Sequence, residues 1–589
     1  MAAEAVRPAL VATGFGLALA LPFFVPRSAV DLLVFAGFYA IGGLGVAFLH
    51  GNCGMVTLAQ SAFYGVGAYS TAFLSGQLGL PSAAGIVGGV GLSAAIAVMV
   101  GWPILRLGGY YLALATLALG MIGSVLFQEL SWVTGGTLGI GGIPSISILG
   151  LELSTPHRFY FLVGAVVVAC VWLQRNLVRS PSGIAMRAMR DSAEAASSLG
   201  IDIGQLKLNM FVMSAVLGSI AGSLFAHYVS FVSVHSFGIQ QAITFLVVAI
   251  VGGVHTVWGP VLGGVFVTLV PAQLSRFGDI HSVLFGLALI ATVIGMPEGI
   301  GGALQRLIRR TGSPVGRPPM VEPAHGLERR PMPKPVAGGD ALSIDRISHA
   351  FQGLVALRDV ELNVRAGTIA ALIGPNGSGK TTLFNIVSGF LHPKHGRVLY
   401  CGREITQDPV DVRSRAGLVR TFQTPRVFER LSTFENLMAG AYKLAGSRTP
   451  EDLLRLPASS RKRSQMEALA ESACRDFGLD HVAWAAAGSL PPGQKRMLEL
   501  ARACVGQPQL LLLDEPSAGL NSDEIAHLKK TLCRVAASGV TILLVSHDMS
   551  VVSVATSVNV LYYGTIIARG TMEEIQGNAQ VREAYLGLP

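Results

Sequence analysis

The sequence predicts a multi-domain chain in which an all-α domain with several membrane spans is followed by a soluble α/β domain. Hydrophobic residues make up 51% of the 589 positions and charged residues only 13%, which is typical of a membrane protein joined to a soluble part. Charge is unevenly distributed, since only ten of the 44 Lys and Arg and nine of the 35 Asp and Glu lie in residues 1–302. The remaining residues contain short apolar runs of strand length beside a Gly-rich loop.

Ten apolar stretches in the first domain approach the length of about 20 residues that crosses a bilayer, so we expect eight to ten spans. Several are interrupted by Gly or Pro, as at residues 51–54 and at Gly259 and Pro260, which favours discontinuous or re-entrant helices around a central pathway. The first stretch lacks a small-residue cleavage site after a charged start, so we interpret it as a span. The stretches are residues 8–25, 29–49, 55–75, 84–105, 109–128, 158–174, 208–228, 240–256, 258–275 and 281–298.

Basic residues indicate which polar segments face the cytoplasm. Five of them bracket one polar loop and three follow the last span, so both places should be cytoplasmic. Basic loops beside an anionic lipid bilayer also account for the net charge of +9, so no nucleic-acid partner is needed. The residues are Arg175, Arg179, Arg187, Arg190 and Lys207 in the loop, and Arg306, Arg309 and Arg310 after the last span.

Residues 303–340 are rich in Pro, Gly and Arg, and are predicted to form a flexible linker between domains at 1–302 and 341–589. A coil of this length has a typical end separation of roughly 35 Å, enough to reach a soluble domain beneath the membrane. Recognition of a partner by this proline-rich stretch is the alternative interpretation.

A phosphate-binding pattern opens the second domain. Residues 374–381 read GPNGSGKT, a match to G-x-x-x-x-G-K-[ST], in which backbone N–H groups converge on phosphate oxygens at a helix N-terminus. The preceding run TIAALI predicts a buried strand, and the following LFNIVSGFL predicts a helix. Lys380 would reach the β- and γ-phosphates of ATP, Thr381 would bind Mg²⁺, and Thr382 would donate a further hydrogen bond to phosphate. The rest of the predicted cradle is Gly374, Pro375, Asn376, Gly377, Ser378 and Gly379.

An acidic pair about 130 residues downstream is the expected counterpart of this loop. Asp514 ends the apolar run 510–513 and is placed to hold Mg²⁺ through water, while Glu515 is placed to polarise the attacking water. An ordinary acidic turn after a buried strand would account for one carboxylate but not for the pair. The sequence therefore predicts Mg²⁺-dependent hydrolysis of ATP.

Further residues follow in an order that resembles the ATP-binding cassette family over residues 342–589. The resemblance implies that Phe351 stacks on adenine, that Gln423 senses Mg²⁺ and the attacking water, and that His547 contacts the γ-phosphate. It places the D-loop at residues 517–521. It places the signature loop at Leu490, Pro491, Pro492, Gly493 and Gln494.

Longer runs resemble the importers of branched-chain amino acids. RTFQTPRVFERLSTFENLMAGA, DEPSAGLN and REAYLG are similar to their ATPase subunits, and residues 51–74, 108–120, 132–144 and 251–264 are similar to their permease subunit. The resemblance implies a permease fused to an ATPase, multi-pass in a bacterial inner membrane with the ATPase domain in the cytoplasm. It also implies three partners: a second permease subunit, a second ATPase subunit and a periplasmic substrate-binding protein.

The run EAASSLG matches the E-A-A-x-x-x-G pattern of importer permeases. It begins at Glu194, and the resemblance implies a short cytoplasmic coupling helix near residues 191–200 that docks into a groove of the ATPase near the loop that contains Gln423. The small Ala195 and Ala196 would permit close approach, and Gly200 would let the chain turn sharply. An ordinary amphipathic surface helix is the alternative.

The signature loop departs from the family pattern. Pro491 replaces a serine and Pro492 the first glycine, and proline has neither the hydroxyl nor a backbone N–H. We therefore hypothesise unequal ATP sites in a dimer with a partner ATPase. The phosphate loop of this chain would be complete, whereas the partner's would face LPPGQ and lack one or two charge-assisted hydrogen bonds of about 1.5 to 3 kcal/mol each.

The cargo is the least determined part of the prediction. Charges are scarce in the first domain, with Arg106 and Glu129 near span ends, which suits a neutral or zwitterionic solute. Branched-chain or related hydrophobic amino acids are the first choice, and urea, short amides or small carboxylates are the alternative for the same machinery. An exporter, a regulatory ATPase and a gated channel are the competing classes, and the EAASSLG run argues against an exporter.

Overall fold

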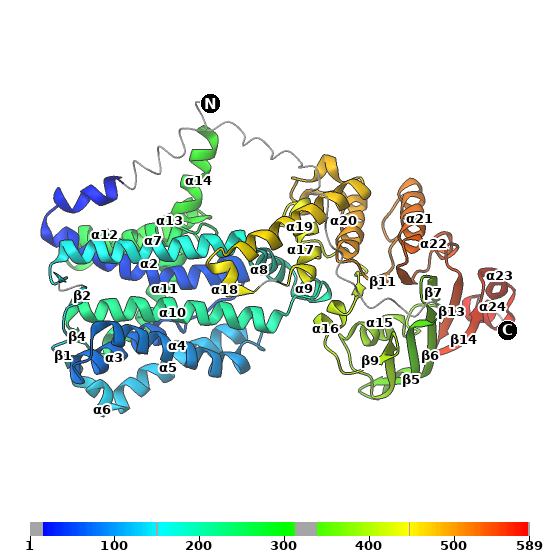
Figure 1. The fold of residues 1–589 in the computed structure, drawn as a ribbon, viewed down its shortest axis with the longest axis horizontal. Helices are drawn as coiled ribbons and strands as arrows, with labels where there is room; N and C mark the ends of the chain where they lie inside the picture. Colours follow the sequence, from blue (N-terminus) through cyan, green and yellow to red (C-terminus); the bar gives the residue numbers. More distant parts are fainter. Residues whose placement is uncertain (1–15, 149–150, 312–338, 447, 587–589) are drawn as a thin grey trace. The chain divides into compact units, whose positions relative to one another are not determined.

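The computed structural model describes residues 16–148, 151–311, 339–446 and 448–586 (Figure 1). The chain folds into two compact units. The first comprises Met1–Arg179 and Gly204–Arg317, and the second comprises Ser180–Ile203 and Pro318–Pro589. The polar loop at 180–203 therefore folds with the second unit, although its neighbours along the chain belong to the first.

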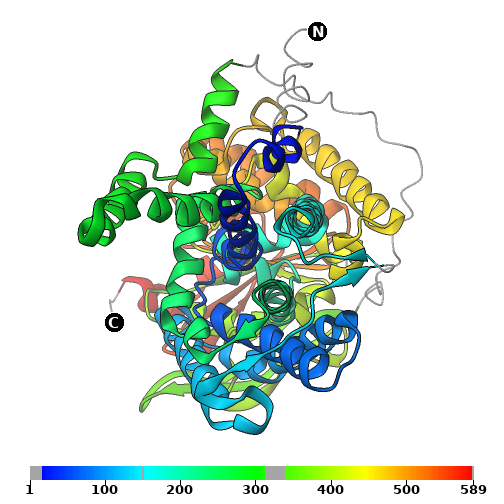
Figure 2. The ribbon, with the colours of Figure 1, turned by 90° about the vertical axis from the view of Figure 1, so that its left-hand side faces the viewer.

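Long apolar helices build the first unit. Within the part of the chain that the structure describes, seven helical runs are long and apolar enough to cross a membrane, which confirms the predicted helical membrane domain. Figure 2 looks along α7 and α10, two of these helices. The runs are α2 (Arg27–Cys53), α4 (Ser82–Ile104), α5 (Gly109–Glu129), α7 (Pro156–Arg179), α10 (Ile203–Val229), Val234–Gly252 containing α11 (Ile239–Gly252), and Gly259–Gly295 containing α12 (Gly259–Leu274) and α13 (His281–Gly295).

The described residues hold seven candidate spans, against the eight to ten predicted for the whole chain. Residues 8–15 of the first predicted stretch lie outside the described residues. The predicted stretch 55–75 forms α3 (Gln60–Thr71), which continues into a π-helical segment (Ala72–Gln77), and ten of the 12 residues of α3 are buried. The last two predicted stretches form one apolar run, which is interrupted where Gly278 takes a φ of 63°.

Two breaks in the helices occur at glycines, the first within the predicted break at residues 51–54 and the second ahead of the predicted break at Gly259 and Pro260. Gly54 ends α2 with a φ of 69°, and Gly253 ends α11 with a φ of 107°. The two breaks touch each other, because a Cβ added to Gly51 would lie 1.9 Å from the Val254 carbonyl oxygen. Glycine is therefore required for this close approach.

Helix α2 is the centre of the first unit and packs against α7, α11 and α12. Two buried amides join its backbone to other helices. The Gln60 side chain donates to the carbonyls of Gly42 and Ser214, both at 3.1 Å, and the Gln174 side chain donates to the Leu44 carbonyl at 3.0 Å. Such bonds satisfy polar groups that have no access to water.

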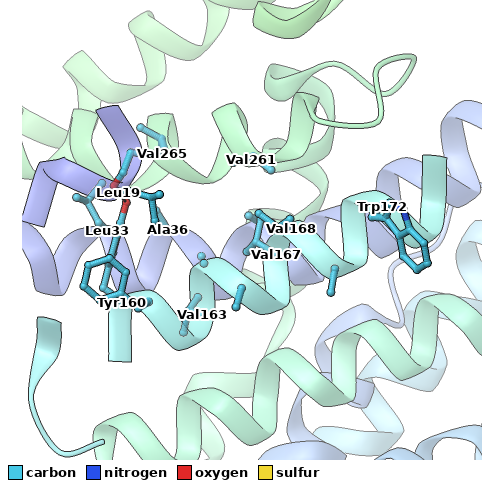
Figure 3. A pocket seen from close by; sticks show the side chains of 17 residues that line it. Leu19, Leu33, Ala36, Tyr160, Val163, Val167, Val168, Trp172, Val261 and Val265 are labelled. Atoms are coloured by element: carbon cyan, nitrogen blue, oxygen red, sulfur yellow. Dashed lines mark hydrogen bonds between the residues drawn. The ribbon is translucent and has the colours of Figure 1, made fainter. Parts of the chain in front are cut away.

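An apolar cavity of about 640 Å³ lies between α2, α7 and α12 (Figure 3). Among the described residues no charged side chain lines it. The Tyr160 hydroxyl, one of its few polar groups, donates to the Ala18 carbonyl at 2.8 Å. The lining therefore offers nothing that would recognise the ammonium and carboxylate groups of an amino acid.

The predicted linker is partly wrong. Residues 303–311 continue α14 (Gly299–Thr311) instead of forming a coil, because Leu304, Leu307 and Ile308 recur at helical spacing between basic residues. Residues 312–338 of the predicted linker lie outside the described residues. The short elements of the first unit are α6 (Ser131–Thr134) and two antiparallel pairs, β1 (Ile140–Gly141) with β4 (Phe231–Val232) and β2 (Ser147–Ile148) with β3 (Leu151–Glu152).

Two sheets organise the second unit. The larger has the order β10-β11-β12-β7-β13-β14 and is parallel except for β14. Its strands are β7 (Ile369–Ile373), β10 (Leu418–Arg420), β11 (Leu510–Asp514), β12 (Thr541–Val545), β13 (Ser557–Tyr562) and β14 (Thr565–Gly570). The smaller is antiparallel with the order β6-β5-β8-β9, from β5 (Asp340–Phe351), β6 (Leu354–Arg365), β8 (His395–Tyr400) and β9 (Arg403–Glu404).

Strands β7, β11 and β12 are buried throughout, as the runs of Ala, Ile, Leu and Val predict for a parallel sheet. The α/β class expected for the second domain is confirmed. Its helices are α15 (Lys380–Ser388), α16 (Val410–Arg415), α17 (Thr433–Ala445), α18 (Thr449–Leu453), α19 (Pro457–Asp476), α20 (Pro492–Val505), α21 (Ser522–Ala537), α22 (Met549–Val552), α23 (Met572–Gly577) and α24 (Ala579–Leu586), joined by α8 (Pro181–Asp191) and α9 (Ala193–Ser198) from the polar loop.

Candidate functional site

The Gly-rich loop joins β7 to α15, as the sequence predicts. Gly374, Gly377 and Gly379 have φ values of 157°, 79° and 107°, which side chains rarely adopt. A Cβ on Gly374 would lie 2.1 Å from the Leu561 carbonyl oxygen, and one on Gly379 would lie 2.6 Å from the Ala356 carbonyl oxygen. The loop can follow this path only with glycine at both positions.

The polar groups of this loop suit a triphosphate. The first N–H groups of α15 have no helical acceptors and face the loop. The Ser378 hydroxyl is buried and has no hydrogen-bond partner among the described residues. The Lys380 ammonium donates to the carbonyls of Gly374 and Pro375, both at 2.8 Å, so it already lies across the loop. Asn376 and Thr381 are exposed beside it.

Asp514 ends β11 as predicted and is paired with a residue that the sequence did not single out. The Arg420 guanidinium, at the end of β10, donates to the Asp514 carboxylate at 3.0 Å, and both side chains are buried. Arg420 also donates to Asn385 and Ser388 of α15, at 2.6 and 3.0 Å. Burial raises the pKa of Asp514, and Arg420 opposes that rise. Arg420 therefore holds the carboxylate in place beside α15.

Glu515 and His547 lie side by side. Glu515 has a φ of 47°, a strained value for a residue with a side chain, and its N–H donates to the Val545 carbonyl at 2.8 Å. One of its carboxylate oxygens lies 2.9 Å from Nδ1 of His547 and accepts the His547 backbone N–H at 3.3 Å. The two residues predicted to act on the attacking water and the γ-phosphate are thus brought together.

Gln423 is exposed, and its backbone is held by a buried ion pair that sequence reasoning missed. Arg496 of α20 donates to the carbonyls of Phe422 and Gln423, at 2.7 and 2.5 Å, and to the Glu515 carbonyl at 3.2 Å. Glu499 pairs with Arg496 at 2.9 Å and accepts the Phe422 N–H at 3.3 Å. Burial raises the pKa of Glu499, an effect that its arginine neighbours oppose. One arginine therefore connects the backbone at Gln423 to the backbone of Glu515.

The predicted signature loop leads into α20. Leu490 is buried, Pro491 is the N-cap and Pro492 the first helical residue, and no side chain caps this end. Gly493 touches an acidic group, because a Cβ there would lie 1.8 Å from Oε1 of Glu524. Proline has no N–H to donate to phosphate, and the neighbouring carboxylate repels an anion. This helix start should therefore bind phosphate weakly, which agrees with the hypothesis of a weak signature loop.

Phe351 ends β5, half exposed, with its ring packed edge-on against His349 at a centroid distance of 4.7 Å. Its contact with adenine stays a prediction, as do the phosphate contact of Thr382 and the contacts that Gln494 would make. Asn521, at the end of the D-loop, is the N-cap of α21 and forms a capping box with Glu524.

The predicted coupling helix exists as α9. Ala195 and Ala196 are fully buried, the Ser198 carbonyl accepts from the Ser414 hydroxyl at 2.7 Å, and Glu194 pairs with Arg426. Gly200, with a φ of 85°, turns the chain where a Cβ would lie 3.1 Å from Arg415 and 3.2 Å from Lys443. These contacts support close approach through small residues, and the coupling role of α9 stays a prediction.

A second docked helix, α8, was not predicted. It buries most of its residues against α17, α18 and α19, and Arg187 pairs with Glu435 at 2.9 Å. The Asp191 carboxylate accepts the Arg430 N–H at 3.0 Å. The Ser-Pro start and the apolar Ile184, Ala185 and Met189 are the helix signals that the sequence offered.

Comparisons with known families match both units. Residues 28–293 match "Branched-chain amino acid transport system / permease component" and residues 357–518 match "ABC transporter". Residues 565–587 match "Branched-chain amino acid ATP-binding cassette transporter".

Individual relatives cover the second unit. A branched-chain amino acid transport ATP-binding protein, BraF of Pseudomonas aeruginosa, is 38% identical over 250 residues, which are 42% of this chain and 97% of the relative. LivG of Escherichia coli K12, described in the same words, is 38% identical over the same shares of both chains. A solved nucleotide-free ATP-binding cassette from an ABC transporter is 30% identical, covers 42% of this chain and 100% of its own, and has a TM-score of 0.38.

Proposed function

Since the chain belongs to the ATP-binding cassette transporters of branched-chain amino acids, as a permease fused to an ATPase, we propose that it imports these or related hydrophobic amino acids across a bacterial inner membrane. The observation that carries the proposal is the pairing of Glu194 with Arg426. It joins a loop of the permease to the segment that begins at Gln423. ATP hydrolysis and transport thus have a physical connection within one chain.

In the ATP site, we propose which residues bind the phosphates, the adenine and Mg²⁺. Lys380 and the backbone of residues 374–379 would hold the phosphates of ATP, and Phe351 would stack on adenine. Thr381, Gln423 and Asp514 would hold Mg²⁺, which when bound neutralises charge on the transferred phosphoryl group. The donors of the loop and the carboxylate and hydroxyl oxygens fit both groups.

Hydrolysis is assigned to the pair of Glu515 and His547. The Glu515 carboxylate would orient the attacking water and accept its proton, and the imidazole of His547, 2.9 Å away, would keep that carboxylate in place. Arg496 holds the carbonyls of both Gln423 and Glu515. We therefore expect a backbone movement at Glu515 to move the segment at Gln423, and with it Arg426 and α9.

The full transporter is proposed to contain a second permease, a second ATPase and a periplasmic substrate-binding protein. The two ATPases would form a head-to-tail dimer in which this chain's phosphate loop meets the partner's signature. The partner's phosphate loop would meet LPPGQ, where the two prolines and Glu524 lower its turnover.

Cargo is tested by uptake of labelled leucine into proteoliposomes that enclose ATP and carry the complex, with the binding protein outside. Inhibition by excess valine but not by urea, short amides or small carboxylates is expected. The opposite pattern of competition would move the cargo to one of these alternatives. Leucine efflux driven by ATP would contradict import and indicate an exporter.

A further inference from the structure

Helix α8 meets the ATPase at both of its ends. Its N-terminus lies against α18 and α19, and its C-terminus lies against the segment that follows Gln423. With 11 residues the helix is about 16 Å long, so the two contacts are well separated.

The first turn of α8 is capped jointly by its own loop and by the ATPase. Pro181 has no N–H, and the Gly183 N–H donates to the Ser180 hydroxyl at 3.3 Å. The remaining early donor, the buried Ser182 N–H, donates to the Asp452 carboxylate at 3.1 Å. Without Asp452 this N–H would be buried and unsatisfied. Docking therefore completes the helix.

Asp452 is itself fully buried at the starts of two helices. Its other carboxylate oxygen accepts the hydroxyl of Ser459, in the first turn of α19, at 2.5 Å. The N-cap of α19 makes no side-chain hydrogen bond of its own. A negative charge is favoured at this position, because it lies at the N-terminus of α8 and accepts the Ser182 N–H.

The C-terminal end of α8 contacts the segment that follows Gln423, and the sides that supply the acidic and the donor groups are exchanged there. There the permease loop supplies the carboxylates: Asp191 accepts the Arg430 N–H at 3.0 Å, and Glu194 pairs with Arg426. Between the two ends, Arg187 pairs with Glu435 of α17 at 2.9 Å.

We infer that Asp452 is a positioning residue for coupling, which anchors the N-terminal end of α8 on the α18–α19 segment. With that end anchored, displacement of the segment that follows Gln423 turns α8 about Asp452 and moves the permease loop at residues 180–203. Without the anchor the loop would slide over the ATPase and the movement would be lost. The inference rests on the proposed function for the step that is transmitted, but the anchoring itself does not depend on the cargo.

The test compares Asp452→Asn with the matched control Glu467→Gln in the full chain, reconstituted with its partner subunits. Glu467 lies on α19 and pairs with Arg463 of the same helix at 2.8 Å. Hydrogen exchange of the amides at 182–186 should accelerate about tenfold in Asp452→Asn, as expected for loss of a charge-assisted hydrogen bond, and stay unchanged in Glu467→Gln. Leucine taken up per ATP hydrolysed should fall at least threefold in Asp452→Asn, while its KM for ATP stays that of the unsubstituted chain.

Unchanged exchange and an unchanged uptake ratio in Asp452→Asn would overturn the inference. If this variant fails to fold, carbodiimide labelling of the unsubstituted complex decides instead: Asp452 should resist labelling while Glu467 reacts, and equal reaction would refute the anchor. Absence of leucine uptake by the unsubstituted complex would count against the proposed cargo alone, because exchange and labelling still report on α8.

Discussion

At the scale of residues, the ATP site depends on pairs that hold each other in place. Asp514 is fixed by Arg420, Glu515 by His547, and the backbone of Gln423 by Arg496. A single substitution can therefore remove the reactive group of one residue while the partner that positions it stays in place.

Replacing Glu515 with Gln should lower ATP hydrolysis at least 100-fold, because the amide cannot accept a proton from water. ATP binding should be retained, since the phosphate loop is untouched. Phosphate release and nucleotide binding by the reconstituted complex measure the two effects. The exposed Glu573→Gln is the control and should hydrolyse ATP normally. Hydrolysis at the normal rate in Glu515→Gln would remove Glu515 from its assigned role.

Lys443 should make the stability of the second unit depend on alkaline pH. Burial lowers its pKa to about 8 from 10.5, so between these values the unfolded chain binds more protons and stability rises with pH. Below about pH 8 both states are protonated, and the contribution is constant. The total rise is roughly 3 kcal/mol.

The urea midpoint of this unit in the full chain, measured by pulse proteolysis across pH 7 to 10.5, follows that rise. The difference between the unsubstituted chain and Lys443→Met should show it, whereas the exposed Lys530→Met should track the unsubstituted chain. A difference that is flat over this range would mean that Lys443 is not desolvated.

At the scale of elements, helix starts and glycine turns decide which surfaces can meet. The start of α20 lacks donors because of two prolines, and the turn after α9 fits closely because Gly200 has no side chain. Substitutions at these two places should therefore change ATP hydrolysis or its coupling to uptake, and they should leave the fold intact.

Restoring the signature with Pro491→Ser and Pro492→Gly should activate the partner's ATP site. In a complex whose Glu515 is replaced by Gln, only that site hydrolyses ATP. There the restored loop should raise turnover about tenfold, the equivalent of one regained hydrogen bond. Phosphate release measures the change, and equal turnover with and without the restored loop would show that the two sites are not limited by LPPGQ.

Gly200→Ala should uncouple hydrolysis from uptake. The added Cβ meets Arg415 and Lys443 at 3.1 to 3.2 Å and is strained at a φ of 85°. Gly539→Ala is the matched control, because φ there is 94° but no atom lies within 4 Å of the added Cβ. Uptake per ATP should fall in the first variant and not in the second. A similar loss in both would assign the effect to backbone strain alone.

At the scale of the whole chain, the sequence predicted those features whose chemistry is local. The phosphate loop, the strands β7 and β11, the acidic pair and α9 each lie in a short run of letters with a known physical meaning. Arg420, Arg496, Glu499 and Asp452 escaped prediction because their roles depend on partners dozens to hundreds of residues away.

The described residues hold seven candidate spans against the eight to ten predicted, for a related reason. Hydropathy cannot distinguish a helix that faces lipid from one that protein surrounds, and α3 is buried almost throughout despite its apolar sequence. The start of the linker was mispredicted because three apolar residues at helical spacing were hidden among prolines, glycines and arginines.

The central claim is that hydrolysis in the second unit drives uptake through the first. The most direct measurement is accumulation of labelled leucine against its gradient, in proteoliposomes that enclose ATP and carry the complex with its binding protein. Accumulation is expected, and it should stop in Glu515→Gln and without ATP. Leucine flux that continues in either case would contradict it and indicate a channel.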